Sequence, residues 1–333
     1  MGRGIAFLHV LTDVAVGRAF RAGLLYRRGF GDRAELERLV GAVVSYSRER
    51  VHEPIRVSWH GERSIGPATV RAGEFVSTTD VPLPDEARRA AVELWLPRGK
   101  RGGPLCLLLA ATGEEGFRRR ASFAAALCRA GIGALLLENP FYGTRRRRGQ
   151  HGPALTTVFD QFAMNLATVD EARALIAWAQ AEGYGPLGVT GYSQGGFMAA
   201  FAGALVDIPL VVVPRGAGTS AAPVFTSSAL SHAVHWPSLA REAGSEREAR
   251  AALVAYLEPV DISKHPPPID ARLSTIVVVR HDRFVPPESG LALHRHWPGS
   301  TLVWSEAGHV TSAVLDTKAH ATAVIDAFAR FRQ

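Results

Sequence analysis

Apolar residues form short, almost unbroken runs along the second two thirds of the chain. These runs lie at 105–110, 132–137, 187–189, 210–213, 275–279 and 301–304. Most of them lack the polar alternation of a half-exposed strand, which is typical of strands covered by helices on both faces. We therefore expect these runs to be the strands of one mostly parallel sheet.

Stretches with helical spacing of apolar residues separate these runs. They cover about 121–130, 156–182, 194–205, 288–296 and 311–331. Strands that alternate with helices predict a doubly wound α/β fold. In such folds the functional groups lie at the carboxyl ends of the strands, so the loops after the runs are the places to search for chemistry.

The first hundred residues have a different pattern. Residues 55–59, 73–78 and 91–96 are predicted strands between proline and glycine turns. Residues 1–50 are a predicted N-terminal helical extension, in which Asp32 caps a second helix that ends at about residue 47. We expect a single domain over 1–333, with residues 215–258 interrupting the strand–helix alternation as a cap or, alternatively, as an irregular connection.

The first predicted helix, between about residues 5 and 26, is apolar but not a signal peptide. His9, Asp13, Arg18 and Arg21 interrupt its apolar residues, whereas a signal peptide needs a continuous apolar core. Its amphipathic pattern has two interpretations. The helix either packs on the domain or lies on an anionic membrane surface with its arginines against lipid phosphates.

Composition restricts the class of protein further. Hydrophobic residues make up 47% of the chain and charged residues 21%, as in ordinary globular proteins, and no apolar run is long enough for a transmembrane helix. Cys106 and Cys128 lie in apolar and helical patterns, so we expect buried thiols and no disulfide scaffold. These features favour a cytoplasmic protein, with peripheral membrane attachment as the alternative.

The net charge of +7 reflects an excess of mostly arginine, which is concentrated at 118–120 and 145–148, after two of the predicted strands. Guanidinium groups bind phosphates in bidentate geometry, so Arg118, Arg145 and Arg146 are candidate substrate-binding residues. The alternative is a solvated basic surface. Zinc-finger spacing, an aromatic RNA-binding strand and a helix-turn-helix pattern are all absent, so we do not expect nucleic-acid binding.

The strongest motif is Gly-Tyr-Ser-Gln-Gly at 191–195, which matches the Gly-x-Ser-x-Gly nucleophile elbow. A predicted strand precedes it and a predicted helix follows it, as the elbow requires. The serine needs an acid and a histidine base. In the fold that carries this motif they follow the serine in that order, each on a loop after a later strand. Asp282 follows the run at 275–279 and His309 follows the run at 301–304. We therefore predict Ser193 as nucleophile, His309 as general base and Asp282 as its orienting acid.

An oxyanion hole needs backbone N–H groups beside this serine. We expect one from Gln194, and a second from the loop after the run at 105–110, with Glu114 as the first choice and Gly113 as the second. The pair His294 and His296 lacks a neighbouring acidic or cysteine ligand, so we expect no metal site. The proposed chemistry needs no cofactor.

Several segments resemble the α/β-hydrolase domain-containing protein 18 family. They are residues 29–31, 112–120, 137–143 (Leu-Glu-Asn-Pro-Phe-Tyr-Gly), 183–188, 297–299 and 308–309. The sequence departs from the family pattern at Ala111, where glycine is expected, and in a short 215–258 region. The resemblance implies an α/β-hydrolase fold and serine-hydrolase activity, and it suggests lipid acyl esters as a substrate class.

The sequence thus leaves three functions to compare. The first is a serine hydrolase for carboxylic esters, including phospholipid acyl esters, acting on small-molecule or lipid substrates. The second is an acyltransferase that uses the same acyl-enzyme. The third is a binding protein that keeps the fold without turnover, against which the intact set of Ser193, Asp282 and His309 argues.

Overall fold

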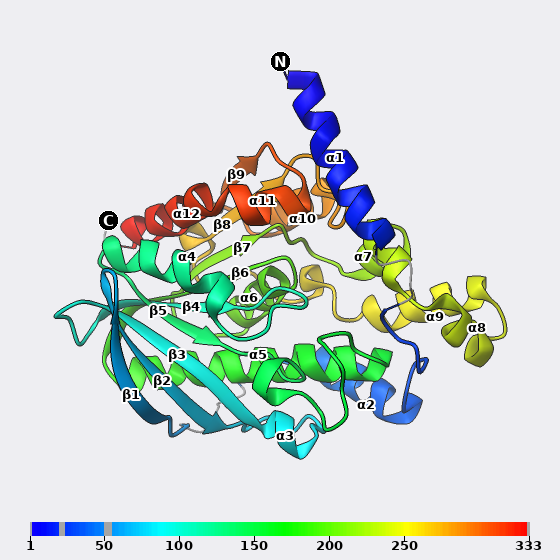
Figure 1. Ribbon diagram of the computed structural model, residues 1–333, viewed down its shortest axis with the longest axis horizontal. Helices are drawn as coiled ribbons and strands as arrows, with labels where there is room; N and C mark the ends of the chain where they lie inside the picture. Colours follow the sequence, from blue (N-terminus) through cyan, green and yellow to red (C-terminus); the bar gives the residue numbers. More distant parts are fainter. Residues whose placement is uncertain (1, 20–23, 50–54, 332–333) are drawn as a thin grey trace.

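The computed structural model describes residues 2–19, 24–49 and 55–331. A nine-stranded sheet runs through its centre in the order β1-β2-β3-β5-β4-β6-β7-β8-β9 (Figure 1). The strands are β1 (Ser58–Ile65), β2 (Ala68–Val76), β3 (Arg89–Pro97), β4 (Gly103–Leu109), β5 (Gly133–Leu137), β6 (Tyr184–Tyr192), β7 (Val211–Arg215), β8 (Thr275–Val279) and β9 (Thr301–Ser305). Strands β4 to β9 pair in parallel, as the apolar runs predict. This part of the prediction is confirmed.

The first three strands form an antiparallel extension of the sheet. Strand β1 is the edge, and nearly all of its side chains are exposed. The prediction of a strand at 55–59 was wrong in its bounds, because an exposed edge strand needs no apolar residues to mark it. A tight turn at Gly66, with φ of 53°, joins β1 to β2.

Helices cover both faces of the sheet. One face carries α4 and α12, and the other carries α5, α6 and α10. Their bounds are α4 (Arg118–Arg129), α5 (Val158–Ala181), α6 (Gln194–Ala204), α10 (Pro287–His296) and α12 (Thr317–Arg330). The predicted helix at 311–331 is two helices, α11 (His309–Leu315) and α12. Asp316 separates them and accepts hydrogen bonds from Ser305 and Ser312.

The N-terminal extension contains two helices, α1 (Gly2–Ala19) and α2 (Arg33–Val44). The Asp32 side chain caps α2 by accepting from the Glu35 N–H, as expected. Helix α1 packs on α11 and on the short helix η3 (Ala229–Ala233) with one face, and exposes Phe7 and Leu8 on the other. Arg21 lies outside the described residues.

The segment 215–258 is mostly helical. After β7 it forms α7 (Ala222–Thr226), η3, α8 (Trp236–Ala243) and α9 (Glu246–Leu257), which lie together at one end of the sheet (Figure 1). Within the described residues, 2–19, 24–49 and 55–331, no helix is long and apolar enough to cross a membrane.

Candidate active site

Ser193 stands on a sharp turn between β6 and α6. Its φ of 54° and ψ of −120° lie in a region that side-chain-bearing residues rarely adopt. The two glycines of the motif are required by contact. A Cβ on Gly191 would lie 2.2 Å from the Gly195 backbone, and a Cβ on Gly195 would lie 2.5 Å from the Leu109 carbonyl oxygen. The elbow therefore raises the Ser193 hydroxyl above the end of the sheet.

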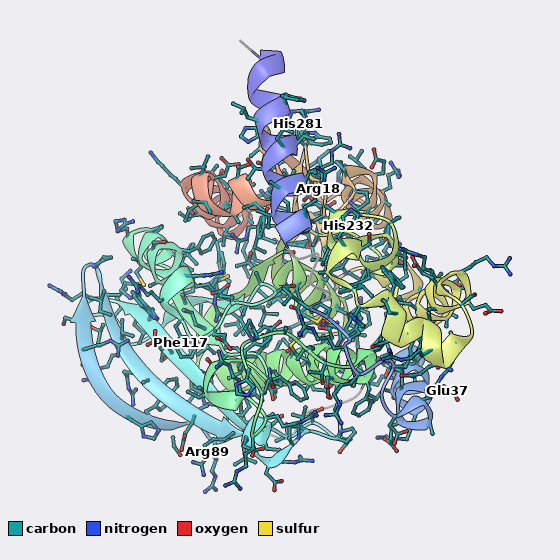
Figure 2. All side chains as sticks on the ribbon, turned by 45° about the vertical axis from the view of Figure 1, so that its right-hand side comes forward. Arg18, Glu37, Arg89, Phe117, His232 and His281 are labelled. Carbon is teal, nitrogen blue, oxygen red and sulfur yellow. The ribbon has the colours of Figure 1, made fainter. Side chains whose placement is uncertain are left out.

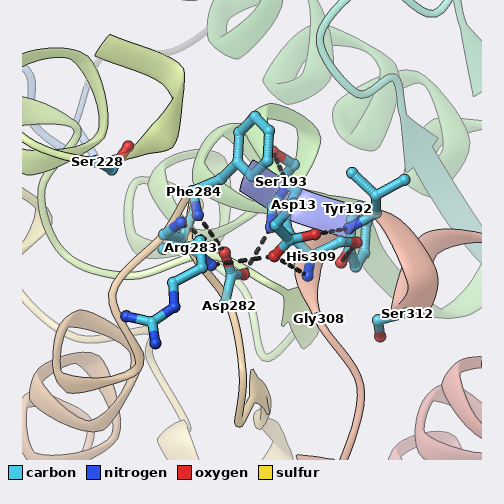
Figure 3. Close-up of polar contacts among 12 residues, drawn as sticks. Asp13, Tyr192, Ser193, Ser228, Asp282, Arg283, Phe284, Gly308, His309 and Ser312 are labelled. Atoms are coloured by element: carbon cyan, nitrogen blue, oxygen red, sulfur yellow. Dashed lines mark hydrogen bonds and ion pairs between the residues drawn. The ribbon is translucent and has the colours of Figure 1, made fainter. Parts of the chain in front are cut away.

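The structure brings the three predicted side chains into one hydrogen-bonded chain (Figure 3). His309 Nε2 lies 2.9 Å from Ser193 Oγ, and His309 Nδ1 lies 2.6 Å from Asp282 Oδ2. Asp282 follows β8, and His309 is the first residue of α11, directly after the loop that leaves β9. Neighbouring parallel strands thus deliver the acid and the base to the same edge of the sheet.

The Asp282 carboxylate is fixed in orientation. Its other oxygen, Oδ1, accepts from the N–H groups of Phe284 and Val285, each at 2.7 Å. Three hydrogen bonds thus hold a carboxylate that is 6% exposed, and this satisfies a charge that would otherwise be costly to bury. Only Oδ2 is left to face the imidazole.

His309 is buried between two aromatic rings. The rings of Tyr192 and Phe284 both lie with centroids 5.1 Å from the imidazole. Burial alone lowers the pKa of His309, but the nearby charges of Asp282 and Asp13 outweigh it, so the pKa is raised above its ordinary value of 6.5. The surroundings therefore stabilise the imidazolium that forms when His309 takes a proton.

Asp13 is a residue of this site that the sequence reasoning did not select, since it appeared only as an interruption of an apolar helix. Its carboxylate is fully buried and accepts from the N–H groups of His309, Val310 and Arg283. The one available signal was a single acid within an otherwise acid-free helix. Nothing local shows that its partners lie at the far end of the chain.

A mainly apolar pocket opens beside Ser193. Its lining includes Phe162, Leu166 and Val169 of α5 with Phe197, Met198 and Phe201 of α6. The segment after β7 adds Ala221, Val224, Phe225, Leu230 and Leu257 to the wall. This segment therefore borders the site. The pocket has about 80 Å³ of room for the centres of water-sized groups.

Polar groups line the pocket only near Ser193. Gln194 donates to Asn165 Oδ1 at 2.8 Å, and Thr112 donates to Gln194 Oε1 at 3.0 Å. Gln161 donates to the same Asn165 oxygen at 3.0 Å. The pocket is thus polar at its reactive end and apolar along its length.

The backbone donors around Ser193 differ from the expectation. The Glu114 N–H donates to the Ala111 carbonyl and the Gly113 N–H donates to the Tyr142 hydroxyl, both at 3.1 Å. The Glu114 carboxylate is directed to Arg120, at 2.6 Å. Both expected second donors are therefore already engaged. Thr112, which lines the pocket, has an N–H with no partner in the described part of the chain.

The prediction that Arg145 binds substrate was wrong. Its guanidinium is fully buried, pairs with both oxygens of Glu171 at 2.6 and 2.8 Å, and donates to the Ala87 and Glu138 carbonyls. These contacts use all of its N–H groups. Arg145 is a structural residue that ties the loop after β5 to α5.

The other two candidate arginines do not line the pocket either. Arg146 is partly exposed and pairs with Glu115. This pairing lowers the pKa of Glu115. Arg118 is exposed at the start of α4. Over the described ranges, no group of three or more histidine, cysteine, aspartate or glutamate side chains is placed to hold a metal ion.

Fold and sheet order define the chain as an α/β-hydrolase. The family model described as alpha/beta hydrolase domain containing 18 matches residues 24–248 and 238–330. Because these matches cover most of the chain, the protein belongs to that family, which confirms the resemblance seen in the sequence.

Solved structures share the fold at low sequence identity. An acetyl xylan esterase from Paenibacillus sp. R4 has a TM-score of 0.60 at 13% identity, covering 91% of this chain and 97% of that chain. Acetyl xylan esterase 1 from Thermoanaerobacterium sp. JW/SL YS485 has a TM-score of 0.56 at 14% identity, covering 93% and 98%. A cold-adapted esterase from an Arctic intertidal metagenomic library has a TM-score of 0.51 at 17% identity, covering 81% and 99%.

Proposed function

We propose that this protein is a serine hydrolase that cleaves carboxylic esters through an acyl-enzyme intermediate. The observation that carries the proposal is the continuous hydrogen-bonded chain from Asp282 through His309 to a strained Ser193 that faces an apolar pocket. The esterase names of the solved structures with this fold agree with the proposal. Similar geometry performs acyl transfer on several unrelated folds.

The geometry suits each proton transfer of the reaction. His309 Nε2 takes the Ser193 proton as the oxygen attacks the ester carbonyl, and it returns that proton to the departing alcohol. Water then attacks the acyl-enzyme with His309 as the base, and His309 returns this proton to Ser193 Oγ as the carboxylic acid departs. Asp282 holds the proton on Nδ1, so that Nε2 is free to accept.

The oxyanion formed in this attack requires two backbone donors. Gln194 supplies one, because its N–H is at the start of α6 where no intrahelical acceptor exists. We assign the second to Thr112, because the N–H groups of Gly113 and Glu114 are engaged elsewhere. The N-terminus of α6 adds favourable electrostatics for the developing negative charge.

The pocket favours an acyl chain as the group that Ser193 accepts. Its walls are mainly apolar side chains, which suit the hydrocarbon of an acyl chain better than a polar group. Along α6 the lining extends from Gln194 to Phe201, which is roughly 10 Å of helical rise. We propose a medium-length acyl chain, with phospholipid esters as one candidate class.

Labelling with a fluorophosphonate probe tests the proposed function. We expect wild-type protein to react at Ser193, identified on its peptide by mass, because an activated serine attacks phosphorus as it attacks a carbonyl carbon. The Ser193→Ala variant should not react. Ser227→Ala, which removes a hydroxyl that donates to the Pro223 carbonyl, should react as the wild type does. Folded wild-type protein that stays unlabelled would refute the proposal and favour a binding protein.

Product analysis separates hydrolase from acyltransferase. Wild-type protein incubated with an activated hexanoyl ester should release free hexanoic acid. Added glycerol or a thiol should not divert the hexanoyl group from water. Predominant transfer to the acceptor, at millimolar acceptor and with the acyl-enzyme formed normally, would instead assign the acyltransferase reaction to the same Ser193.

The far end of the pocket should set acyl length. Val43 of α2 lines the pocket. We place it at the far end because Tyr46, one turn later on α2, donates to Asp170, which follows the lining residue Val169 on α5. We expect Val43→Phe to fill this end and to lower kcat/KM for hexanoyl relative to acetyl esters at least about tenfold. Rates on a series of p-nitrophenyl esters measure this.

Val44 provides a matched control for that substitution. It is the next residue of α2 and is 64% exposed, so Val44→Phe adds the same ring outside the pocket. Its chain-length preference should equal that of the wild type. If Val43→Phe also leaves the preference unchanged while the protein stays folded, the acyl chain does not occupy this end.

A further inference from the structure

The inner face of α1 presents one carboxylate to the loops that carry the acid and the base. Asp13 is the only acidic residue of α1, and it is fully buried. Its Oδ2 accepts from the His309 N–H at 2.8 Å and from the Arg283 N–H at 3.1 Å, while Oδ1 accepts from the Val310 N–H at 2.9 Å (Figure 3).

These bonds join the loops after β8 and β9, which also meet directly where the His281 N–H donates to the Ala307 carbonyl at 3.0 Å, and which both contact His9. Arg283 directly follows Asp282, and His309 begins α11. The Asp13 carboxylate adds a further link between the two loops, and it does so at the height of the Asp282–His309 bond. Buried N–H groups and a buried charge each need a partner, so the three donors and Asp13 satisfy one another.

Gly308 shows that α1 must approach this closely. It precedes α11 and has no side chain to cap the helix, so Asp13 supplies the missing acceptor from a distant part of the chain. A Cβ on Gly308 would lie 2.9 Å from the His9 carbonyl oxygen and 3.1 Å from Asp13 Oδ2. Glycine is therefore what allows α1 to contact the loop.

Further contacts hold α1 in place. His9 Nδ1 lies 2.8 Å from Thr311 Oγ1, and the rings of His9 and His281 stack at 6.5 Å. Gly17 lies against Ala229 of η3, where a Cβ would be 2.8 Å from the carbonyl oxygen. Figure 2 shows α1 on this side of the molecule, with Arg18, His232 and His281 labelled along it.

We propose that Asp13 is a positioning residue for the Ser193–His309–Asp282 chain, holding the acid-bearing and base-bearing loops at their working separation. Its effect on catalysis rests on the proposed hydrolase function, whereas its effect on loop order does not. Two groups place negative charge against His309, Asp282 through its ring nitrogen and Asp13 through its backbone N–H. The phenol of Tyr192 donates to the His309 carbonyl at 2.5 Å.

The Asp13→Asn variant tests the proposal in two ways. An amide has one acceptor oxygen, so at least one of the three N–H groups must face an NH₂ donor. Amide hydrogen exchange in peptides that cover 280–286 and 306–313 should become at least about tenfold faster, while exchange in β6 stays unchanged. This readout needs no turnover.

The kinetic readout follows kcat and KM for a p-nitrophenyl hexanoate substrate. We expect kcat to fall at least about tenfold with KM nearly unchanged, because misplaced catalytic groups reduce rate while the pocket is untouched. The acid limb of the kcat/KM profile should shift to lower pH, because one negative charge beside His309 is lost. Asp32→Asn, which removes the same charge from the cap of α2, should change none of these values.

Each outcome distinguishes the proposals. Fast exchange in both loops without any wild-type activity supports the positioning role and refutes the hydrolase. Unchanged exchange together with unchanged kcat and acid limb in a folded Asp13→Asn protein overturns the positioning role. If Asp13→Asn does not fold, Gly308→Ala, which keeps the carboxylate but forces it away from the loop, should give the same changes in smaller size. Wild-type exchange and kcat in Gly308→Ala would overturn the proposal.

Discussion

Asp282→Asn is expected to lower kcat for ester hydrolysis about 10⁴-fold while the protein stays folded. Two backbone donors, from Phe284 and Val285, point at Oδ1 and require an oxygen there. The amide NH₂ of the variant must therefore face His309 Nδ1. This donor forces the imidazole proton onto Nε2, which then cannot accept the proton of Ser193.

Steady-state rates with a hexanoyl ester at neutral pH measure this loss. Asp270→Asn is a suitable control, because Asp270 also accepts from a backbone N–H in a turn but lies outside the candidate site. It should retain wild-type kcat. A loss below about tenfold in folded Asp282→Asn would mean that His309 does not depend on Asp282 for its tautomer.

Arg145→Met is expected to destabilise the protein by about 3–5 kcal/mol, because it leaves the Glu171 carboxylate buried without its counter-charge. The Ala87 and Glu138 carbonyls also lose their donors. For a chain of 333 residues, this lowers Tm by roughly 4–7 °C. Thermal unfolding followed by circular dichroism measures the shift.

The neighbouring arginine is the matched control. Arg146 pairs with Glu115 at a partly exposed position, so Arg146→Met should cost no more than about 1 kcal/mol. The double variant Arg145→Met/Glu171→Leu removes both buried charges and should recover part of the lost stability. Equal shifts in the two single arginine variants would contradict the assignment of Arg145 as a structural residue.

The parallel strands could be predicted from sequence because burial on both faces leaves an unambiguous mark. Strands β5, β7 and β8 are buried along their whole length and coincide with apolar runs. The helix cap at Asp32 was equally readable, and its side chain accepts from the Glu35 N–H at the start of α2. The exposed edge strand β1 had no such mark, and its bounds were missed.

The site was predictable where chemistry follows chain order and not where it depends on packing. The elbow motif and the positions of Asp282 and His309 after successive strands place all three residues at one edge. The position of Arg145 after a strand end could not show whether its side chain turns outward or inward. Its partner Glu171 lies on α5 in the interior, and only the packed structure reveals the pair.

The bonds of Asp13 also have a consequence for the order in which the candidate site assembles. The carboxylate and the His309 N–H are separated by 296 positions in the chain. A ribosome therefore makes α1 long before it makes the partner loop. Contacts of such wide separation form only after most of the chain is available. A nascent chain that already contains Ser193 and its elbow thus lacks the completed Asp13–His309 contact until β9 and α11 emerge and dock against α1.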